Sequence, residues 1–400
     1  MDNETLGNFR KRVERELHGD ILPFWLRHSL DTRHGGFIGR MMNDRTVVEN
    51  APKGLILNAR VLWTFSAVYR YDYDSRFLQL AQRAYEYLDR YFRDRDFGGV
   101  FWLLDSQGHG LDDMKKIYGQ AFYLYALAEY YRATRLEPAL RHAIEVFQLI
   151  EKHSHDDQYL GYYETLNRDW TPAEDSRLSG KDMNEKKSMN NHLHLLEAYT
   201  NLYRVWNGDL ARERLLELIG IFQHQILDAT HSHFQHFFDE HWVPKSSTYT
   251  FGHDIEGSWL LWEAAEVLGV EAIKAHVKDT ILSLAEAVYQ EGFDSDGGLF
   301  YEGKEGTIID TNKEWWPQAE AVVGMINAYQ LSGGEKYLLA ALQCWDFIET
   351  RIVDQQRGEW FWRVSREGIV DDSQPKISEW KGPYHNTRAC LEILHRLRSM

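Results

Sequence analysis

The chain has 400 residues, of which 61 are acidic and 45 are basic, so its formal net charge is −16 at pH 7. This charge argues against nucleic acid and anionic membrane surfaces as partners, and it favours a neutral or small ligand. The amino terminus has no apolar targeting core and no run is long enough to cross a bilayer, so we expect a cytoplasmic protein.

A turn that combines glycine with aromatic residues recurs along the chain at intervals of 60 to 63 residues. Its glycines are Gly36, Gly99, Gly161, Gly298 and Gly358. The gap of 137 residues between Gly161 and Gly298 is about two periods, and segment 233–238 stands where the missing turn belongs. Six units therefore fill the chain, and such internal repetition predicts a repeat architecture.

Between these turns, large apolar residues recur three and four positions apart, as in Leu80, Ala84, Tyr87 and Tyr91. This spacing is the period of a helix. The predicted helical pairs, in chain order, are 55–69 with 77–91, 120–131 with 138–150, 192–206 with 210–226, 255–268 with 273–289, and 317–330 with 336–348. Each unit is thus predicted to be two helices and a short β-like turn.

Six helical hairpins could form an open solenoid or a closed ring with one helix of each pair inside. A solenoid needs polar capping repeats at its ends, whereas the last unit is rich in aromatic residues such as Trp360, Trp362 and Tyr384. We therefore expect an all-α fold, an (α/α)6 barrel with its β-like turns at one end, as a single domain spanning residues 1–400. The polar segment 171–188 is expected to form a lid or pocket wall.

Aromatic residues are abundant, with 14 tryptophans and 22 tyrosines. Most must belong to the core, but several stand beside polar residues at the expected barrel mouth, namely Tyr118, Trp259, Trp315, Trp316 and Trp380. Flat aromatic faces next to carboxylates and amides suit a sugar ring, which has apolar faces and a hydroxylated rim. A carbohydrate ligand is therefore one candidate.

Histidines and carboxylates occur at helical offsets where inner helices are expected to begin. The pairs three or four residues apart are His253 with Glu256, Asn190 with His194, and Trp316 with Glu320. Members of each pair project from one helix face. A lone histidine in such a place is more often a cap or a buried polar group, but these segments, with His385 before the last helix, converge on one barrel end. We interpret His231, His233 and His236 as loop residues.

Other chemistries lack their motifs. The sequence contains no zinc-ligand spacing of the His-Glu-x-x-His type, no phosphate-binding glycine loop, no dinucleotide fingerprint and no serine nucleophile elbow. We therefore expect no metal and no cofactor. Histidine titrates near pH 6.5 and can both take and return a proton. Two histidines on opposite sides of a planar intermediate could remove a proton from one face and deliver one to the other, which is epimerisation.

Several motifs, in order and over essentially the whole chain, resemble those of the cellobiose 2-epimerases, a branch of the N-acylglucosamine 2-epimerase superfamily of (α/α)6 barrels. They lie in segments 57–60, 188–199, 251–260, 315–320 and 380–386. The resemblance implies a cofactor-free isomerase that epimerises the reducing-end glucose of β-1,4-linked disaccharides, converting cellobiose to glucosyl-mannose and lactose to epilactose.

The resemblance also implies roles for individual residues. His253 and His385 would be the acid–base pair at C2, and His194 would assist proton movement around O1 and ring opening. The resemblance implies that substrate is bound by Arg60, Tyr118, Asp182, Asn190, Glu256, Trp316, Glu320 and Trp380. We add Trp259 to the predicted substrate-binding residues because it is one of the aromatic residues expected at the barrel mouth.

Alternatives remain open. A mannose 2-epimerase, a mannose isomerase or an N-acylglucosamine 2-epimerase could share most of these motifs. Inverting glycosidases also use (α/α)6 barrels. They work with a pair of carboxylates, and Glu256 and Glu320 could provide such a pair. A non-catalytic binding scaffold is a further possibility. The outer helices show no sustained heptads, so we expect a monomer.

Overall fold

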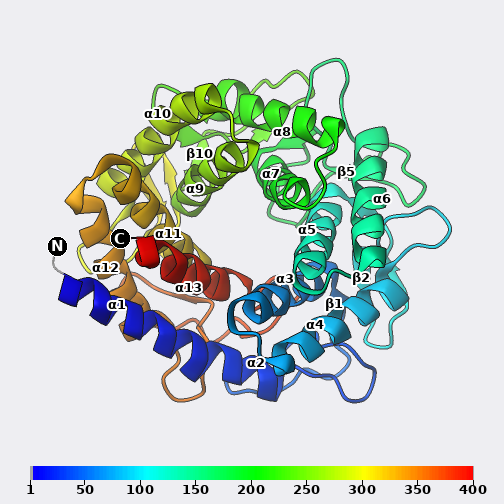
Figure 1. The fold of residues 1–400 in the computed structure, drawn as a ribbon, viewed down its shortest axis with the longest axis horizontal. Coiled ribbons are helices and arrows are strands. Elements are labelled where there is room, and N and C mark those ends of the chain that lie inside the picture. The colour runs from blue at the N-terminus through cyan, green and yellow to red at the C-terminus, as the bar shows by residue number, and fades with distance from the viewer. Residues whose placement is uncertain (1–2, 400) are drawn as a thin grey trace.

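The computed structural model describes residues 3–399. Within them, a ring of inner helices is surrounded by a ring of outer helices (Figure 1). The inner helices are α3 (Leu55–Asp72), α5 (Ile117–Thr134), α7 (Met189–Tyr203), α9 (Phe251–Leu268), α11 (Trp315–Ser332) and α13 (Tyr384–Arg396). The outer helices are α1 (Asn3–Glu16), α2 (Leu22–His28), α4 (Ser75–Tyr87), α6 (Glu137–His153), α8 (Asp209–Ile221), α10 (Glu271–Ala287) and α12 (Glu335–Phe347).

Burial distinguishes the two rings. Every residue of α3 from Leu55 to Val68 is buried, because this helix has neighbours on all sides. In α4 the buried residues Phe77, Leu80, Ala81, Ala84 and Tyr87 follow a single helical stripe. An all-apolar helix belongs inside a large core and an amphipathic one on its surface. The apolar spacing of the sequence therefore specifies which helix of each pair lies inside.

The ring is closed by the two ends of the chain. α13, drawn in red in Figure 1, packs between α11 and α3, while α1, drawn in blue, packs against α13. The sequence predicted five helical pairs, and the sixth consists of α1 and α2 from the amino terminus with α13 from the carboxyl terminus. The predicted (α/α)6 barrel is confirmed, and the solenoid is excluded by this contact between first and last units.

Single-turn π-helices and one 3₁₀ helix extend the helical elements. The π-helical turns are η1 (Leu17–Ile21), η2 (Leu88–Phe92), η3 (Phe222–Ile226), η4 (Val288–Gly292) and η5 (Ile348–Ile352), and the 3₁₀ helix is η6 (Leu397–Ser399). η1 joins α1 to α2, whereas η2 to η5 end outer helices. They lead into the loops that carry the recurring glycine turns.

Short antiparallel strands connect neighbouring units at one end of the barrel. They are β1 (Lys53–Gly54), β2 (Leu103–Leu104), β3 (Gly110–Asp112), β4 (Lys115–Lys116), β5 (Thr165–Leu166), β6 (Lys187–Ser188), β7 (Leu227–Asp228), β8 (His233–Phe234), β9 (Phe237–Phe238), β10 (Thr248–Thr250), β11 (Glu302–Lys304), β12 (Thr307–Asp310), β13 (Lys313–Glu314) and β14 (Arg363–Val364). Their sheets are β1-β2-β3, β10-β11-β12, β13-β14, β4-β5, β6-β9 and β7-β8. Most of these pairings join a strand that precedes one inner helix to the loop of the next unit, which aligns the helix starts.

The opposite end has only short connections. α3, α5, α9 and α11 each end at a residue in the left-handed conformation whose backbone N–H closes the last turn, namely Tyr73, Arg135, Gly269 and Gly333. Such C-caps stop a helix within one residue. The long loops and the starts of the inner helices are thereby gathered at the strand-bearing end.

A buried lysine anchors the glycine turn in five of the six units. The pairs are Lys53–Asp31, Lys115–Asp94, Lys187–Asp156, Lys313–Asp294 and Lys376–Asp354, with Nζ to carboxylate distances of 2.6–3.0 Å. The unit whose glycine is missing has no such lysine and pairs His233 with Asp254 at 2.8 Å instead. The His233 ring also stacks on Tyr249 with centroids 3.6 Å apart. His233, predicted as a loop residue, is therefore a buried structural group.

Among the described residues 3–399, none of the helices combines the length and the apolar character that crossing a bilayer requires.

Candidate active site

The inner helices begin at a common level, so equivalent positions face the barrel axis together. The sixth residues of α3, α5, α7, α9 and α11 are Arg60, Phe122, His194, Glu256 and Glu320. Along this layer the Arg60 guanidinium lies 4.7 Å from the Phe122 ring centroid, and the Phe122 and His194 rings lie 4.7 Å apart. The repeat thus assembles a cation, an imidazole and two carboxyl groups from distant parts of the chain.

A cavity of about 460 Å³ opens above this layer at the strand-bearing end, within the size range of small-molecule sites. Ten of the twelve predicted site residues line it: Arg60, Tyr118, Asp182, Asn190, His194, His253, Glu256, Trp316, Trp380 and His385. Residues 178–182 form one wall, as expected for segment 171–188. The helix starts therefore do converge on a single pocket.

Two predicted substrate-binding residues lie behind the cavity wall. Trp259 is only 1% exposed and donates from Nε1 to Oε2 of Glu320 at 3.1 Å. It stands eight residues into α9, about 12 Å below the helix start, which places it too deep for the mouth. Glu320 is likewise fully buried and contacts the cavity through His385. The expectation that Trp259 lies in the mouth is therefore wrong, and both residues support the wall.

The three cavity histidines share one hydrogen-bonding pattern. Nδ1 of His194 lies 3.0 Å from Oε2 of Glu197, Nδ1 of His253 lies 2.5 Å from Oγ1 of Thr250, and Nδ1 of His385 lies 2.7 Å from Oε1 of Glu320. Within residues 3–399 their Nε2 atoms have no hydrogen-bond partner. Each ring is thus held by one nitrogen and offers the other to the cavity, as acid–base catalysis requires.

His192 shows the opposite pattern. Its Nδ1 lies 2.7 Å from the Ser188 carbonyl oxygen, and its Nε2 accepts from the Tyr162 backbone N–H at 2.9 Å. Burial lowers the pKa of His192 to about 3, so the ring is neutral. Gln120 and Gln318 stand at the same position of their helices and accept the equivalent N–H bonds. His192 is therefore a structural residue of the repeat.

Four charged groups form the floor of the cavity. Nη2 of Arg388 contacts Oε1 of Glu320 at 2.7 Å and also pairs with Glu256, while Nη1 pairs with Glu197 and with the Tyr384 hydroxyl. All five side chains are buried. The guanidinium also packs on the Trp259 ring, 4.8 Å from its centroid. Arg388 thus neutralises part of the carboxylate charge behind the histidines.

Burial and the neighbouring charges set the protonation of the carboxyl groups in the floor. Burial and the charge of Glu320, partly offset by Arg388, raise the pKa of Glu256 to about 7. Burial alone would raise the pKa of Glu197, but Arg388, His194 and Tyr384 together outweigh it and the pKa lies below the usual value. Glu256 can therefore gain or lose a proton near neutral pH while Glu197 stays ionised.

His253 and His385 are both neutral at neutral pH. Burial, with His236 and His194 nearby, holds the pKa of His253 well below 6.5. Burial and the guanidinium groups of Arg60 and Arg388 hold the pKa of His385 well below the same value. An imidazole with a lowered pKa is unprotonated and available as a base.

Arg60 lines the cavity and has no carboxylate partner within residues 3–399. Its Nη1 donates to the Trp380 carbonyl oxygen and its Nη2 to the Tyr118 hydroxyl at 3.2 Å. An arginine held by neutral groups keeps its full charge for a ligand. It can therefore stabilise negative charge that develops on a substrate oxygen.

Two further cavities adjoin the first. One of about 320 Å³ shares Asp182, Asn190 and His253 with it, and one of about 410 Å³ shares Leu178, Ser179 and Trp380. His236, predicted as a loop residue, lines the smaller of these, with its ring centroid 5.7 Å from that of His253. The shared lining residues join the three cavities, so the cleft extends beyond the first of them.

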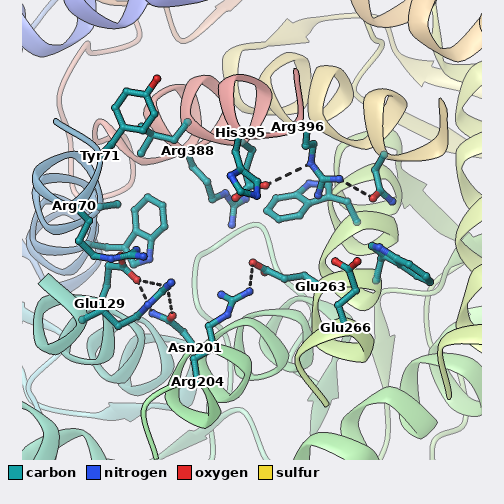
Figure 2. A pocket seen from close by; sticks show the side chains of 18 of the residues that line it. Arg70, Tyr71, Glu129, Asn201, Arg204, Glu263, Glu266, Arg388, His395 and Arg396 are labelled. Carbon is teal, nitrogen blue, oxygen red and sulfur yellow. Dashed lines mark hydrogen bonds and ion pairs between the residues drawn. The ribbon is translucent and has the colours of Figure 1, made fainter. Parts of the chain in front are cut away.

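A separate cavity of about 610 Å³ lies at the other end of the barrel (Figure 2). Ion pairs cross its walls, including Arg70–Glu129 at 2.5 Å and Arg204–Glu263 at 2.8 Å. These arginines lie at the carboxyl ends of inner helices, where cations offset the helix dipole. Arg388 and Trp259 separate this cavity from the catalytic candidates, so we assign the site to the strand-bearing end.

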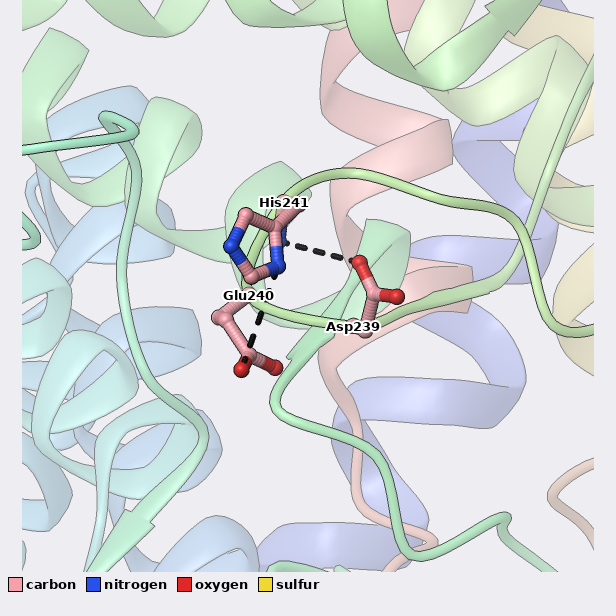
Figure 3. A group of neighbouring side chains, drawn as sticks. All are labelled: Asp239, Glu240 and His241. Carbon is pink, nitrogen blue, oxygen red and sulfur yellow. Dashed lines mark hydrogen bonds and ion pairs between the residues drawn. The ribbon is translucent and has the colours of Figure 1, made fainter.

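Two groups within residues 3–399 have ligand atoms close enough to hold a cation. Glu256, Glu320 and His385 form the first, but the Arg388 guanidinium already bridges both carboxyl groups there. The second, Asp239, Glu240 and His241, consists of consecutive residues of one turn (Figure 3). There Asp239 caps the turn by accepting from the His241 backbone N–H at 2.9 Å and pairs with Lys245 at 2.8 Å. In each group, at least one carboxyl group is thus already paired with a cationic side chain of the protein.

The fold and the site together define an (α/α)6-barrel protein whose candidate acid–base groups are histidines in an aromatic-walled cavity. Residues 36–389 match the family model of the N-acylglucosamine 2-epimerases, and the chain belongs to this family.

Individual relatives agree with this assignment. The chain is 44% identical to a cellobiose 2-epimerase of Bacteroides fragilis over 96% of its own length and 98% of the relative's. It is 37% identical to a cellobiose 2-epimerase of Dictyoglomus turgidum, over 99% of its own length and the whole of the relative. Its structure superposes on that of a cellobiose 2-epimerase from Bacillus thermoamylovorans with a TM-score of 0.93 and 38% identity, covering 98% of this chain and all of that one.

Sequence reasoning missed the residues that support the histidines. Thr250 holds His253, Glu197 holds His194, and Arg388 holds both Glu256 and Glu320. Glu197 could have been found, because it lies three residues after His194 on the same helix face. The sequence marks Thr250 as an N-cap residue. For Arg388 the sequence gives no signal of its role beyond its position near the start of the last helix.

Proposed function

We propose that the protein is a 2-epimerase that interconverts glucose and mannose at the reducing end of β-1,4-linked disaccharides, cellobiose and lactose among them. One observation carries this proposal: three imidazoles open their Nε2 atoms into a single cavity walled by tryptophans. The 44% and 37% identical relatives named as cellobiose 2-epimerases support the choice of a disaccharide.

The reaction begins with ring opening, because only a carbonyl at C1 acidifies the proton on C2. The imidazolium form of His385, with Nδ1–H held by Glu320, donates its Nε2 proton to the ring oxygen while the hydroxyl on C1 loses one, so the aldehyde results and His385 becomes neutral. His194 lies in the layer next to Arg60 and Phe122, where it can accept the proton from the C1 hydroxyl. The Nδ1 contact between His194 and Glu197 stabilises the imidazolium that this step produces.

Epimerisation follows at C2. One imidazole removes the C2 proton and leaves a cis-enediolate, whose charge on O1 is stabilised by Arg60 and His194. The other imidazole, which must carry a proton at this stage, delivers it to the opposite face, so the two histidines exchange protonation states during the step. His253 stands on α9 and His385 on α13, with the Trp316 ring 4.8 Å and 5.6 Å from them. Each histidine contributes about 10²–10⁴-fold as a general acid or base.

The tryptophans provide the apolar surfaces on which sugar faces pack. Trp316 packs against the rings of both histidines, and Trp380 stands against Tyr118 and Trp102 at the adjoining 410 Å³ cavity. Asn190 offers a buried Oδ1 that has no partner among the described residues, which a sugar hydroxyl can satisfy. The connected cavities give room for the second sugar ring.

Hydrolysis by paired carboxylates is the less favoured function. Inverting glycosidases separate their carboxyl groups by about 6.5–9.5 Å so that a water molecule fits between them. Oxygens of Glu256 and Glu320 lie within 4.8 Å of each other, and Arg388 bridges them. This geometry leaves no space for the water.

Product analysis tests the proposal. The protein is incubated separately with cellobiose, mannose and N-acetylglucosamine in D₂O. We expect an isomeric disaccharide from cellobiose with deuterium at C2. Release of glucose would instead indicate hydrolysis, turnover of mannose or N-acetylglucosamine alone would indicate a monosaccharide enzyme, and the absence of deuterium from every sugar would indicate a binding protein.

A further inference from the structure

Thr250 occupies the N-cap position of α9, directly before the first helical residue, Phe251. A threonine there ordinarily accepts a hydrogen bond from the backbone N–H of the second or third helical residue. The equivalent residue of α7, Ser188, does so, since its hydroxyl accepts from the Asn191 N–H at 3.1 Å. The Thr250 side chain makes no capping bond. Its hydroxyl is diverted from the backbone.

The Thr250 hydroxyl instead contacts the side chain of the third helical residue, His253. Oγ1 of Thr250 lies 2.5 Å from Nδ1 of His253, and Thr250 is 95% buried. The threonine itself is fixed by its strand, because β10 pairs with β11, and by its backbone N–H, which donates to Nε2 of His236 at 3.3 Å. The hydroxyl is therefore a rigid partner for the imidazole.

We propose that Thr250 is a positioning residue that selects the working tautomer of His253. When Oγ1 accepts from Nδ1–H, the lone pair of the neutral ring lies on Nε2, which faces the cavity. A base at C2 needs its lone pair there. This inference rests on the proposed function for its kinetic consequence, but the tautomer of His253 is a property of the free protein.

The support differs between the two histidines of the proposed pair. His385 is backed by the carboxyl group of Glu320, whereas His253 is backed by a neutral hydroxyl. A hydroxyl stabilises an imidazolium less than a carboxylate does. His236 and His194 are the titratable groups that act most strongly on His253, while the carboxyl groups of Glu256 and Asp182 line the same cavity without a hydrogen bond to its ring. Thr250 therefore fixes orientation and tautomer without raising the proton affinity of the ring.

The test compares Thr250→Val, which keeps the shape and removes the hydroxyl, with Thr250→Ser, which keeps the hydroxyl. Thr200→Val is the matched control, because Thr200 is buried on inner helix α7 and its hydroxyl donates to the Leu196 carbonyl oxygen, away from the cavity. With cellobiose we expect kcat to fall about 10-fold to 100-fold in Thr250→Val, part of the 10²–10⁴-fold that an acid–base group supplies, with KM little changed. Thr250→Ser restores most of the loss, and Thr200→Val matches the unchanged protein.

A second measurement needs no substrate. ¹⁵N-histidine NMR of the full chain, with His253→Ala to assign the resonance, reports which ring nitrogen carries the proton. We expect Nδ1–H in the unchanged protein and in Thr250→Ser, and proton density on Nε2 in Thr250→Val. An Nε2–H tautomer in the unchanged protein, identical spectra for both Thr250 variants, or failure of serine to restore the spectrum would overturn the proposal. If cellobiose is not turned over at all, the proposed function fails while these spectra still decide the role of Thr250.

Discussion

Nδ1 of His385 lies 2.7 Å from Oε1 of Glu320, and the same carboxylate oxygen accepts from Arg388 at 2.7 Å. The carboxyl group fixes the tautomer of the imidazole and aims its Nε2 at the cavity. The arginine limits how strongly that carboxyl group can hold a proton on the ring. His385 is thus arranged to carry a proton briefly and release it, which is what a reversible proton transfer demands.

Removing either histidine of the proposed pair should stop turnover. We expect His253→Ala and His385→Ala each to lose at least about 10²-fold in kcat with cellobiose, because inversion at C2 needs a proton donor and acceptor on opposite faces. Circular dichroism should show unchanged helix content. Full activity in either folded variant would remove that residue from the mechanism.

Activity should persist at pH values below 6.5. The pKa of His253 and that of His385 both lie well below 6.5, so the bases stay unprotonated until the pH falls through these lowered values. The acid limb of the kcat/KM profile should therefore lie below pH 6.5. Glu256, with a pKa of about 7, should add an inflection near neutrality that Glu256→Gln lacks. A profile with its acid limb at or above 6.5 would contradict the burial of these rings.

His192 and His194 should behave differently although they are two residues apart. His192→Ala leaves the buried Tyr162 N–H without its acceptor, which should lower the free energy of unfolding by about 1–3 kcal/mol. His192→Gln should recover part of this loss, since Gln120 and Gln318 accept the equivalent bonds. His194→Ala should instead reduce kcat with little loss of stability. Urea denaturation and initial rates measure both effects, and equal stability losses for the two alanine variants would refute the distinction.

Arg388→Met should destabilise the barrel strongly. It leaves Glu197, Glu256 and Glu320 buried without their cation, and breaking such a buried pair costs about 3–5 kcal/mol. Without the arginine the pKa values of these carboxyl groups in the folded state rise above their unfolded values, so stability is highest at low pH and falls as the pH rises. Urea titrations at pH 5 and pH 8 should show a larger deficit at pH 8. A deficit independent of pH would show that lost packing, not charge, is responsible.

Much of the architecture could be predicted because it repeats. The interval between glycine turns and the apolar spacing of segments such as 55–69 and 77–91 indicate helical pairs, and the inner helices are those buried all round. The first outer helix, α1, was missed as a partner of the last inner one, since α1 ends at Glu16 and α13 begins only at Tyr384. Pairing between the two chain ends has no local signal.

The site was predicted in part for the same reason. Offsets of three and four residues place His253 with Glu256 and Asn190 with His194 on single helix faces, and the structure brings all four to one cavity. Trp259 was misplaced, because the polar residues His253, Asp254 and Glu256 shortly precede it in sequence, while its depth along α9 decides its surroundings. Residue type near a motif does not report depth below the mouth.

The amino-acid sequence by itself determined the helical repeat, the faces of the helices and the residue types available for acid–base chemistry, because these depend on spacings of a few residues along one chain segment. Tertiary structure alone decided which imidazoles are free and which are tied at both nitrogens. That outcome depends on partners such as Tyr162, Thr250 and Glu320, brought together by ring closure and strand pairing, and on the burial that lowers the pKa of the rings.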